Sequence, residues 1–143
     1  MSDVNMACLQ DLEKDQSYRT INRVSEADVI KFAELTGDIN PLHLDETYAK
    51  TTIFGERIAH GMLSAGYISA IFGTKFPGAG CIYLSQSLAF KAPVKIGDSV
   101  ETTVTITDLN EKRKRVTLSC QCRVGDIIVL TGEAQLMVPR RED

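Results

Sequence analysis

The sequence predicts a single α+β domain in which a curved antiparallel sheet wraps around one hydrophobic helix. The segment 61–72 consists almost entirely of apolar and small residues, as expected for a helix buried on most sides, and Gly73 is expected to end it. From about residue 82 the apolar residues recur at every second position, which indicates strands with one buried face. Such a sheet must be covered by another layer, and the helix over 61–72 is the only segment apolar enough. The length of 143 residues fits one domain.

The first predicted elements are a short strand over 18–23 and an amphipathic helix. Ser25 and Asp28 form an S-x-x-D signal, in which the serine oxygen accepts from an early helix N–H and the aspartate lies at the positive end of the helix dipole. Gly37 is a typical residue for the end of this helix. Because the first residues are polar and without a pattern, we expect the chain to divide into a flexible N-terminal segment over 1–17, a folded domain over 18–139 and a C-terminal tail over 140–143.

Four further strands are predicted between residues 84 and 138. Turn signals at 93–98, 110–114 and 125–126 separate them. The apolar residues share one parity and the polar residues the other, so one face of the sheet should be buried. The positions expected to be buried are Leu84, Leu88, Phe90, Val100, Val104, Ile106, Val116, Leu118, Cys120, Cys122, Val124, Ile128, Leu130, Ala134, Leu136 and Val138.

The composition argues against several classes of partner. Sixteen Lys and Arg residues against 19 Asp and Glu residues give a net charge of −3, without the basic excess of nucleic-acid-binding proteins. The first residues lack the apolar region of a secretory signal, and no apolar run has the length of a membrane span. We therefore expect a cytoplasmic protein with no nucleic-acid partner and no membrane partner.

The four cysteines are expected to be structural. None belongs to a C-x-x-C pair, the spacing of zinc ribbons and redox motifs. Cys120 and Cys122 lie one residue apart in a predicted strand, so both should face the same side of the sheet and pack in the core. With two histidines and no carboxylate cluster beside them, the sequence predicts no metal site and no cofactor.

The candidate site lies in the segment 38–59, which has no clear period beyond a short helical turn near 45–49. Loops of this length are often functional. His43 follows Asp38 by five residues and lies just beyond Pro41, which restricts the backbone. An aspartate and a neutral histidine held on one rigid turn can share a water molecule and so add or remove water. The structural interpretation stays open: Asp38 caps the preceding turn and His43 is a satisfied histidine.

Two other features also have both a structural and a functional interpretation. Gly61 follows His60 at the start of the apolar helix; it either lets the chain enter the helix or offers its N–H to a developing oxyanion. The basic run 112–115 lies at a predicted hairpin tip, where it is either solvated or in contact with a phosphate group. No serine lies in a G-x-S-x-G elbow, so a serine hydrolase has no support.

The sequence around the candidate site resembles the signature of the MaoC-like hydratase family, whose best-known members are (R)-specific enoyl-CoA hydratases. The resemblance covers about residues 18–139 and implies the hot-dog fold, a curved antiparallel sheet wrapped around a central helix. The residues that carry it are Phe32–Asp45 with the core Gly37-Asp38-Ile39-Asn40-Pro41-Leu42-His43, then Ala49, Ile58–Met62, Pro77-Gly78 and Tyr83–Gln86.

The resemblance also implies an activity and a role for each site residue. The chain would be a hydro-lyase that reversibly hydrates trans-2-enoyl-CoA to (3R)-3-hydroxyacyl-CoA, working as a homodimer with an acyl-CoA thioester as substrate. Asp38 and His43 would act on one water, with Asn40 holding the turn. Gly61 would donate its N–H to the thioester oxygen, and Ser69 would make a secondary polar contact.

Three alternatives stay open at this point. A (3R)-hydroxyacyl-ACP dehydratase would need a basic rim for the acidic carrier protein, for which the run 112–115 is the candidate. A hot-dog thioesterase would use Asp38 to activate water against the carbonyl. A non-enzymatic binding module would be favoured if Asp38 and His43 lay far apart. The sequence does not predict the acyl-chain length, nor a pathway among polyhydroxyalkanoate supply, fatty-acid synthesis and β-oxidation.

Overall fold

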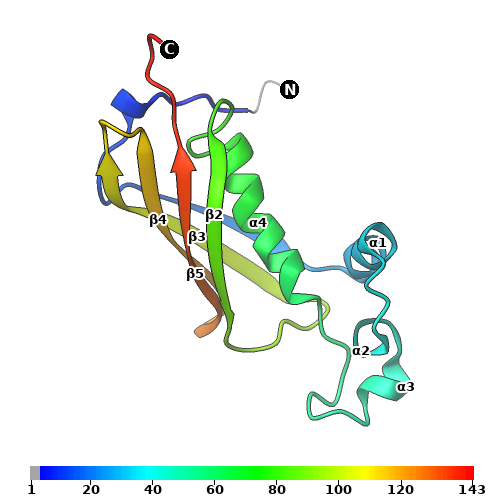
Figure 1. The fold of residues 1–143 in the computed structure, drawn as a ribbon. Helices are drawn as coiled ribbons and strands as arrows, with labels where there is room; N and C mark the ends of the chain where they lie inside the picture. Colours follow the sequence, from blue (N-terminus) through cyan, green and yellow to red (C-terminus); the bar gives the residue numbers. More distant parts are fainter. Residues whose placement is uncertain (1–3) are drawn as a thin grey trace.

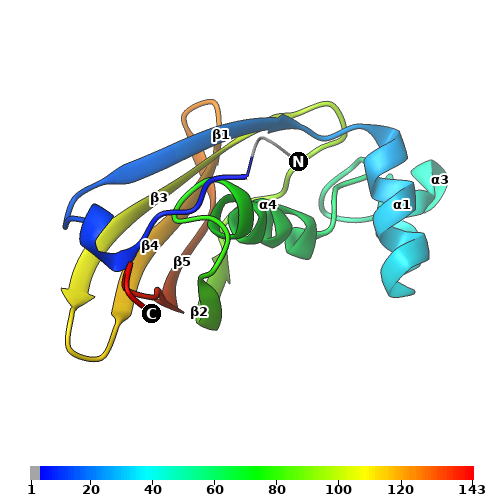
Figure 2. The ribbon, with the colours of Figure 1, turned by 90° about the horizontal axis from the view of Figure 1, so that it is seen from above.

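The computed structural model describes residues 4–143 as a five-stranded antiparallel sheet curved around one long helix, α4 (Gly61–Thr74) (Figure 1). The strand order is β1-β3-β4-β5-β2, and all neighbouring strands are antiparallel. Figure 2 shows α4 inside the curve of the sheet. The strands are β1 (Ser17–Arg23), β2 (Ile82–Phe90), β3 (Ser99–Asn110), β4 (Arg115–Val124) and β5 (Ile127–Met137). The predicted α+β architecture is confirmed.

Helix α1 (Glu26–Thr36) begins and ends where the sequence predicts. The Ser25 side chain accepts from the Asp28 N–H at 3.1 Å, and the Asp28 carboxylate accepts from the Ser25 N–H at 3.0 Å, which completes a capping box. The bond from the Ser25 N–H, and next the Ser25 hydroxyl beside the carboxylate, favour the ionised form, so the pKa of Asp28 is lowered. Gly37 ends the helix in the left-handed conformation, with φ of 81°.

The segment 38–59 contains two short helices where the sequence suggests at most one turn. Asn40 caps α2 (Pro41–Leu44), its side chain accepting from the Leu42 N–H at 3.0 Å. Asp45 caps α3 (Glu46–Ala49) in the same way. Helices α1, α2 and α3 form a group that extends beyond one end of the sheet (Figures 1 and 2).

Helix α4 covers the concave face of the sheet with one side only. Ile68, Ile71 and Phe72 are at most 1% exposed and pack against the apolar face of the strands. The other side carries Met62, Gly66, Ser69, Ala70 and Gly73, which are exposed within the single chain. The helix was predicted to be buried on most sides, but within the single chain only one of its faces is buried. It also continues through Gly73, the predicted end, to Thr74. Among the described residues, no helix is long and apolar enough to span a bilayer.

Most of the strand positions predicted to be buried lie in the core, but three do not. Leu84 and Ile128 are each 43% exposed and Phe90 is 54% exposed, while Val129, on the opposite parity, is buried. Register shifts explain two of these errors: one interrupts the β2–β5 pairing at Leu84, and one interrupts the β4–β5 pairing at Val129, just after Ile128. An extra residue in one strand reverses the side-chain parity beyond it.

The predicted structural role of the cysteines agrees with their positions. Cys120 and Cys122 are both buried on β4 and belong to the core. All four thiols are free. Burial raises the pKa of Cys120 to about 11, as expected for an unreactive thiol in apolar surroundings.

Part of the N-terminal segment is packed, in contrast to the expected flexibility over 1–17. Leu9 and Leu12 are buried in the core, and a short 3-10 helix covers Leu9–Asp11. The Leu9 N–H donates to the Pro139 carbonyl at 2.9 Å, and the Ala7 N–H donates to the Pro77 carbonyl at 2.9 Å. The apolar side chains of Leu9 and Leu12 are the sequence signal for this packing. Residues 1–3 lie outside the described part.

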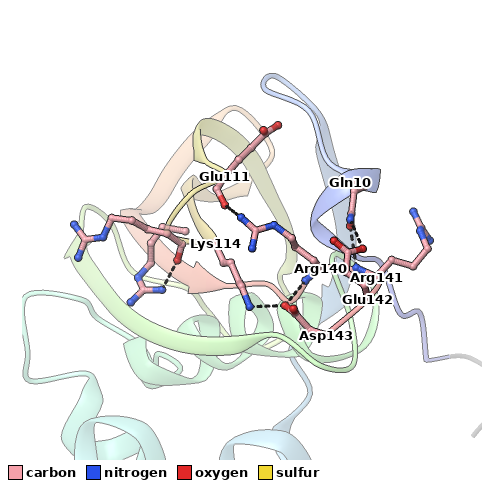
Figure 3. A network of polar contacts seen from close by, with 9 residues as sticks. Gln10, Glu111, Lys114, Arg140, Arg141, Glu142 and Asp143 are labelled. Atoms are coloured by element: carbon pink, nitrogen blue, oxygen red, sulfur yellow. Dashed lines mark hydrogen bonds and ion pairs between the residues drawn. The ribbon is translucent and has the colours of Figure 1, made fainter.

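The C-terminal tail over 140–143 is held against the β3–β4 hairpin tip and the N-terminal segment (Figure 3). The Arg140 guanidinium donates to the Glu111 carbonyl, and Lys114 forms an ion pair with Asp143. Between these two residues of the tail, the Glu142 carboxylate accepts from the Gln10 amide, and the Arg141 guanidinium donates to the Asp11 carboxylate. The hairpin tip lies at the end of the sheet opposite the group α1–α3 (Figure 1).

Candidate active site

The two residues of the predicted pair, Asp38 and His43, lie next to each other and beside His60. Asp38 is in the loop between α1 and α2, His43 is in α2, and His60 is the N-cap residue of α4. A carboxylate oxygen of Asp38 and one ring nitrogen of each histidine all lie within 4.8 Å of one another. Since a hydrogen bond to water spans about 2.8 Å, one water molecule can bridge Asp38 and His43. The separation that would favour a mere binding module is not found.

A hydrogen bond to the backbone carbonyl of Ile58 holds His43 in one tautomer. The side chain is 8% exposed, and its Nδ1 lies 2.7 Å from the Ile58 carbonyl oxygen. Because a carbonyl only accepts hydrogen bonds, Nδ1 carries the hydrogen. In the neutral ring, Nε2 therefore keeps its lone pair.

The surroundings of His43 favour this neutral form. Burial lowers its pKa below the usual 6.5, and the neighbouring His60 acts in the same direction. The Ile58 carbonyl and the Asp38 carboxylate oppose the shift without reversing it. His43 is thus an uncharged base at neutral pH.

Asp38 is exposed and lies on a short turn held at its backbone. Its N–H donates to the Thr36 hydroxyl at 3.2 Å, and its carboxylate accepts from the Asn40 N–H at 3.4 Å. The Asn40 side chain caps α2. The turn-holding role that the family resemblance implies for Asn40 stays a prediction.

A pocket of about 420 Å³ extends from the two histidines along the first turn of α4 toward β5. Gly61 is the first residue of α4, so its N–H is among those without an acceptor inside the helix. A side chain at Gly61 would not fit: a Cβ would lie 2.6 Å from Cε1 of Phe90. The pocket is mostly apolar, and its lining residues are His43, Phe54, Ile58, Ala59, His60, Gly61, Met62, Ser64, Phe90, Lys91, Ala92, Pro93, Val94, Val129 and Leu130.

Ser69 does not lie with the other predicted site residues. It is exposed on α4, eight residues or about 12 Å along the helix from Gly61, and does not line the pocket. The serine that does line the pocket is Ser64, which is 3% exposed. Within the single chain, a substrate contact by Ser69 stays a prediction.

Sequence reasoning missed two residues that hold the site together. The Arg57 Nε donates to the His43 carbonyl at 2.8 Å, and its Nη1 forms an ion pair with Glu26 of α1 at 2.8 Å. The His60 Nε2 lies 3.0 Å from the Asp38 carbonyl oxygen. Both side chains bind backbone carbonyls, which every residue type has, so these contacts leave no signal in the sequence, although His60 lies in the Ile58–Met62 stretch that carries the resemblance.

In the described part of the chain, Asp38, His43 and His60 are also the group close enough to share a metal ion. Each histidine already uses one ring nitrogen on a backbone carbonyl, which leaves one nitrogen per ring. The expectation that the chain binds no metal therefore stays a prediction.

The fold and the site define a hot-dog domain with an aspartate–histidine pair at the N-terminal end of its central helix. The family model described as "MaoC like domain" matches residues 9–124. The chain belongs to the MaoC-like family.

Several similar proteins have named activities. The (R)-specific enoyl-CoA hydratase of Rhodospirillum rubrum is 50% identical over 139 residues, which span 97% of this chain and 96% of that protein. The 3-hydroxybutyryl-CoA dehydratase of Methylorubrum extorquens is 47% identical over 143 residues, 100% of this chain and 91% of that protein. A solved structure, the (R)-hydratase from A. caviae involved in PHA biosynthesis, superposes with a TM-score of 0.88 at 44% identity, covering 91% of this chain and 99% of that one.

Proposed function

We propose that this chain is an (R)-specific enoyl-CoA hydratase, which reversibly adds water to a trans-2-enoyl-CoA to form a (3R)-3-hydroxyacyl-CoA. The observation that carries the proposal is the approach of the Asp38 carboxylate and a His43 ring nitrogen to within 4.8 Å, beside an apolar pocket. The identities of 50% and 47% to a hydratase and a dehydratase of acyl-CoA substrates, over nearly the whole chain, support the same reaction.

In the proposed mechanism one water molecule lies between Asp38 and His43. The Asp38 carboxylate accepts one hydrogen bond from this water and orients it. His43 Nε2 accepts the other water proton as the oxygen attacks C3 of the enoyl group. The same proton then passes from the imidazolium to C2. The net reaction adds H and OH to the same face of the double bond, and the reverse steps give dehydration.

The negative charge that develops on the thioester oxygen also needs a partner. We assign this role to the N–H of Gly61, which is at the positive end of the α4 dipole and lines the pocket. Loss of one such donor typically costs about 3 kcal/mol of transition-state stabilisation. The proposed chemistry uses no metal and no cofactor.

The proposed active form is a homodimer. Strand β2 is an edge strand, and its residues Ile82, Leu84 and Phe90 are between 43% and 54% exposed. Unpaired edges and apolar patches of this kind are usually covered by a partner in soluble proteins. Sedimentation analysis at assay concentrations should give twice the chain mass, and Leu84→Lys should shift it toward the monomer. A wild-type monomer would contradict the dimer.

The proposed substrate carrier is coenzyme A and the proposed compartment is the cytoplasm. Four free thiols fit a reducing compartment. The basic hairpin tip, the candidate surface for an acyl carrier protein, lies at the far end of the sheet from the site in the same chain (Figure 1). Higher turnover on acyl-carrier-protein thioesters than on CoA thioesters of equal chain length would identify the carrier-protein dehydratase instead.

The reaction is tested with Asp38→Asn and His43→Gln, using loss of the enoyl absorbance of crotonyl-CoA and chiral analysis of the product. Each variant should lose at least about 100-fold in kcat while its thermal unfolding stays close to wild type. Asp108→Asn, which removes an exposed carboxylate on β3, is the matched control and should keep full activity. Near-normal turnover by either site variant would refute the assignment. Release of free thiol by the wild type would indicate a thioesterase.

A further inference from the structure

His60 makes contacts that its place at the start of a helix does not require. It is the N-cap residue of α4, where a short polar side chain usually accepts from the first N–H groups, yet its side chain makes no such bond. The ring is instead turned toward the loop that carries Asp38. It is 2% exposed, so its position is defined by the protein around it.

Three contacts define that position. The His60 Nε2 lies 3.0 Å from the Asp38 carbonyl oxygen and, because a carbonyl only accepts, Nε2 carries the hydrogen. One face of the ring packs on His43, with centroids 3.9 Å apart and an interplanar angle of 31°. The ring also contacts Phe32 of α1, with centroids 4.7 Å apart. His60 thus touches both members of the Asp38–His43 pair.

The remaining ring nitrogen of His60 is an independent sign of function. Nδ1 is buried and has no hydrogen-bond partner among the described residues. A buried polar atom without a partner reduces stability, and such atoms are rare in folded proteins. A phenylalanine would fill the same space without this loss. The hydrogen bond that Nε2 donates to the Asp38 carbonyl therefore explains why a histidine is present here.

Asp38 needs such a contact because the other hydrogen bonds of its turn, from the Asp38 N–H to Thr36 and from the Ile39 N–H to Gly37, are local and do not tie it to another element. The side chain is exposed, and the bond to its carboxylate from the Asn40 N–H is long, at 3.4 Å. The loop between the end of α1 and the cap of α2 consists of Asp38 and Ile39 after Gly37. His60 ties the carbonyl of this turn to the start of α4, which also carries Gly61.

We propose that His60 is a positioning residue, which fixes the separation of the Asp38 carboxylate from His43 by holding the Asp38 carbonyl and packing on the His43 ring. This inference rests on the proposed hydration reaction. His60 does not contact the water or the substrate carbonyl in this role. A displacement of about 1 Å in such a pair can lower turnover up to 100-fold, so the effect should appear in kcat.

The test compares His60→Phe, which keeps an aromatic ring but loses the N–H, with His60→Gln, which keeps an N–H donor but loses the ring. Leu35→Ala, at an exposed apolar position of α1, is the control for changes near this loop. Each protein is assayed for kcat and KM with crotonyl-CoA, for Tm, and for backbone ¹⁵N order parameters of residues 38–40. The order parameters do not depend on activity.

His60→Phe should lower kcat at least about tenfold, with KM within about threefold, because the pocket itself is unchanged. Its Tm should stay within about 4 °C of wild type, since the lost hydrogen bond is offset by removal of the unpartnered Nδ1. Order parameters at 38–40 should fall, and His60→Gln should restore both the order and most of kcat.

Wild-type kcat and wild-type order in His60→Phe would overturn the inference. So would a parallel loss of kcat and Tm in both His60 variants, because that result describes a general packing role. A wild-type protein that hydrates no enoyl-CoA would contradict the proposed function alone. The order parameters of the turn would still decide whether His60 positions Asp38.

Discussion

The substitution Gly61→Ala tests whether the active site needs a residue without a side chain at this position. It should lower catalysis while leaving the stability of the fold nearly unchanged. An alanine Cβ at this position would lie 2.6 Å from Cε1 and 2.8 Å from Cδ1 of Phe90, roughly 1 Å inside ordinary van der Waals contact. Either the Phe90 ring or the first turn of α4 must move by about that distance. Both line the substrate pocket, and the turn carries the N–H proposed to bind the thioester oxygen.

The expected cost falls on catalysis. A shift of about 1 Å should lower kcat/KM for crotonyl-CoA by about 10- to 100-fold. Stability should change little: Phe90 is not part of the tightly packed core, so its ring can shift, and alanine is favoured over glycine in a helix by up to about 1 kcal/mol.

The assay measures kcat/KM and urea unfolding for Gly61→Ala and for Gly73→Ala. Gly73 is in the same helix, but a Cβ there meets nothing within 4 Å. The control should match wild type in activity and equal or exceed it in stability. Wild-type kcat/KM in Gly61→Ala would refute the reasoning, and so would a large loss of stability with unchanged catalysis in the remaining folded protein.

The site and the sheet support four further predictions. Since burial lowers the pKa of His43, hydration should keep its full rate as pH falls to about 6.5 and then decrease about tenfold per unit below the lowered pKa; a decline that begins well above pH 6.5 would contradict a neutral base. The same shift makes the folded state lose stability relative to the unfolded state as pH falls below about 6.5, by at most about 1.4 kcal/mol per pH unit, which urea unfolding across pH can measure. Gly132→Ala on β5 should destabilise the sheet by at least about 2 kcal/mol, because its Cβ would lie 2.0 Å from the Ser87 carbonyl oxygen; unchanged urea unfolding would contradict this packing. Dialysis against EDTA should leave hydration unchanged, and an activity loss reversed by added zinc would show that Asp38, His43 and His60 hold a metal.

The elements that the sequence predicted best are those with local signals. The S-x-x-D cap and Gly37 define α1 almost to the residue, because a cap acts through the hydrogen bonds of adjacent residues. The alternation in β3 and in most of β4 is equally clear. Ile128 was assigned to the buried face because the register shift at Val129 depends on pairing with β4, which one strand alone does not indicate.

The site shows the same division between local and long-range information. Asp38 and His43 could be found because they lie on one turn with Pro41 between them. Arg57 and His60 could not, because their partners are backbone carbonyls 14 and 22 residues away in the chain. Such contacts depend on the path of the backbone and leave no constraint on the residue type at the acceptor.

The contact between residues 10–11 and the C-terminal tail, beside the hairpin tip, has a consequence for the attachment of other domains. Gln10 bonds to Glu142 (Figure 3) and Asp11 to Arg141, at the end of the sheet away from α1–α3 (Figure 1). A partner domain fused after Asp143 therefore lies at the end of the sheet away from the entrance for substrate. Whatever is attached there stays on the face remote from catalysis within the same chain.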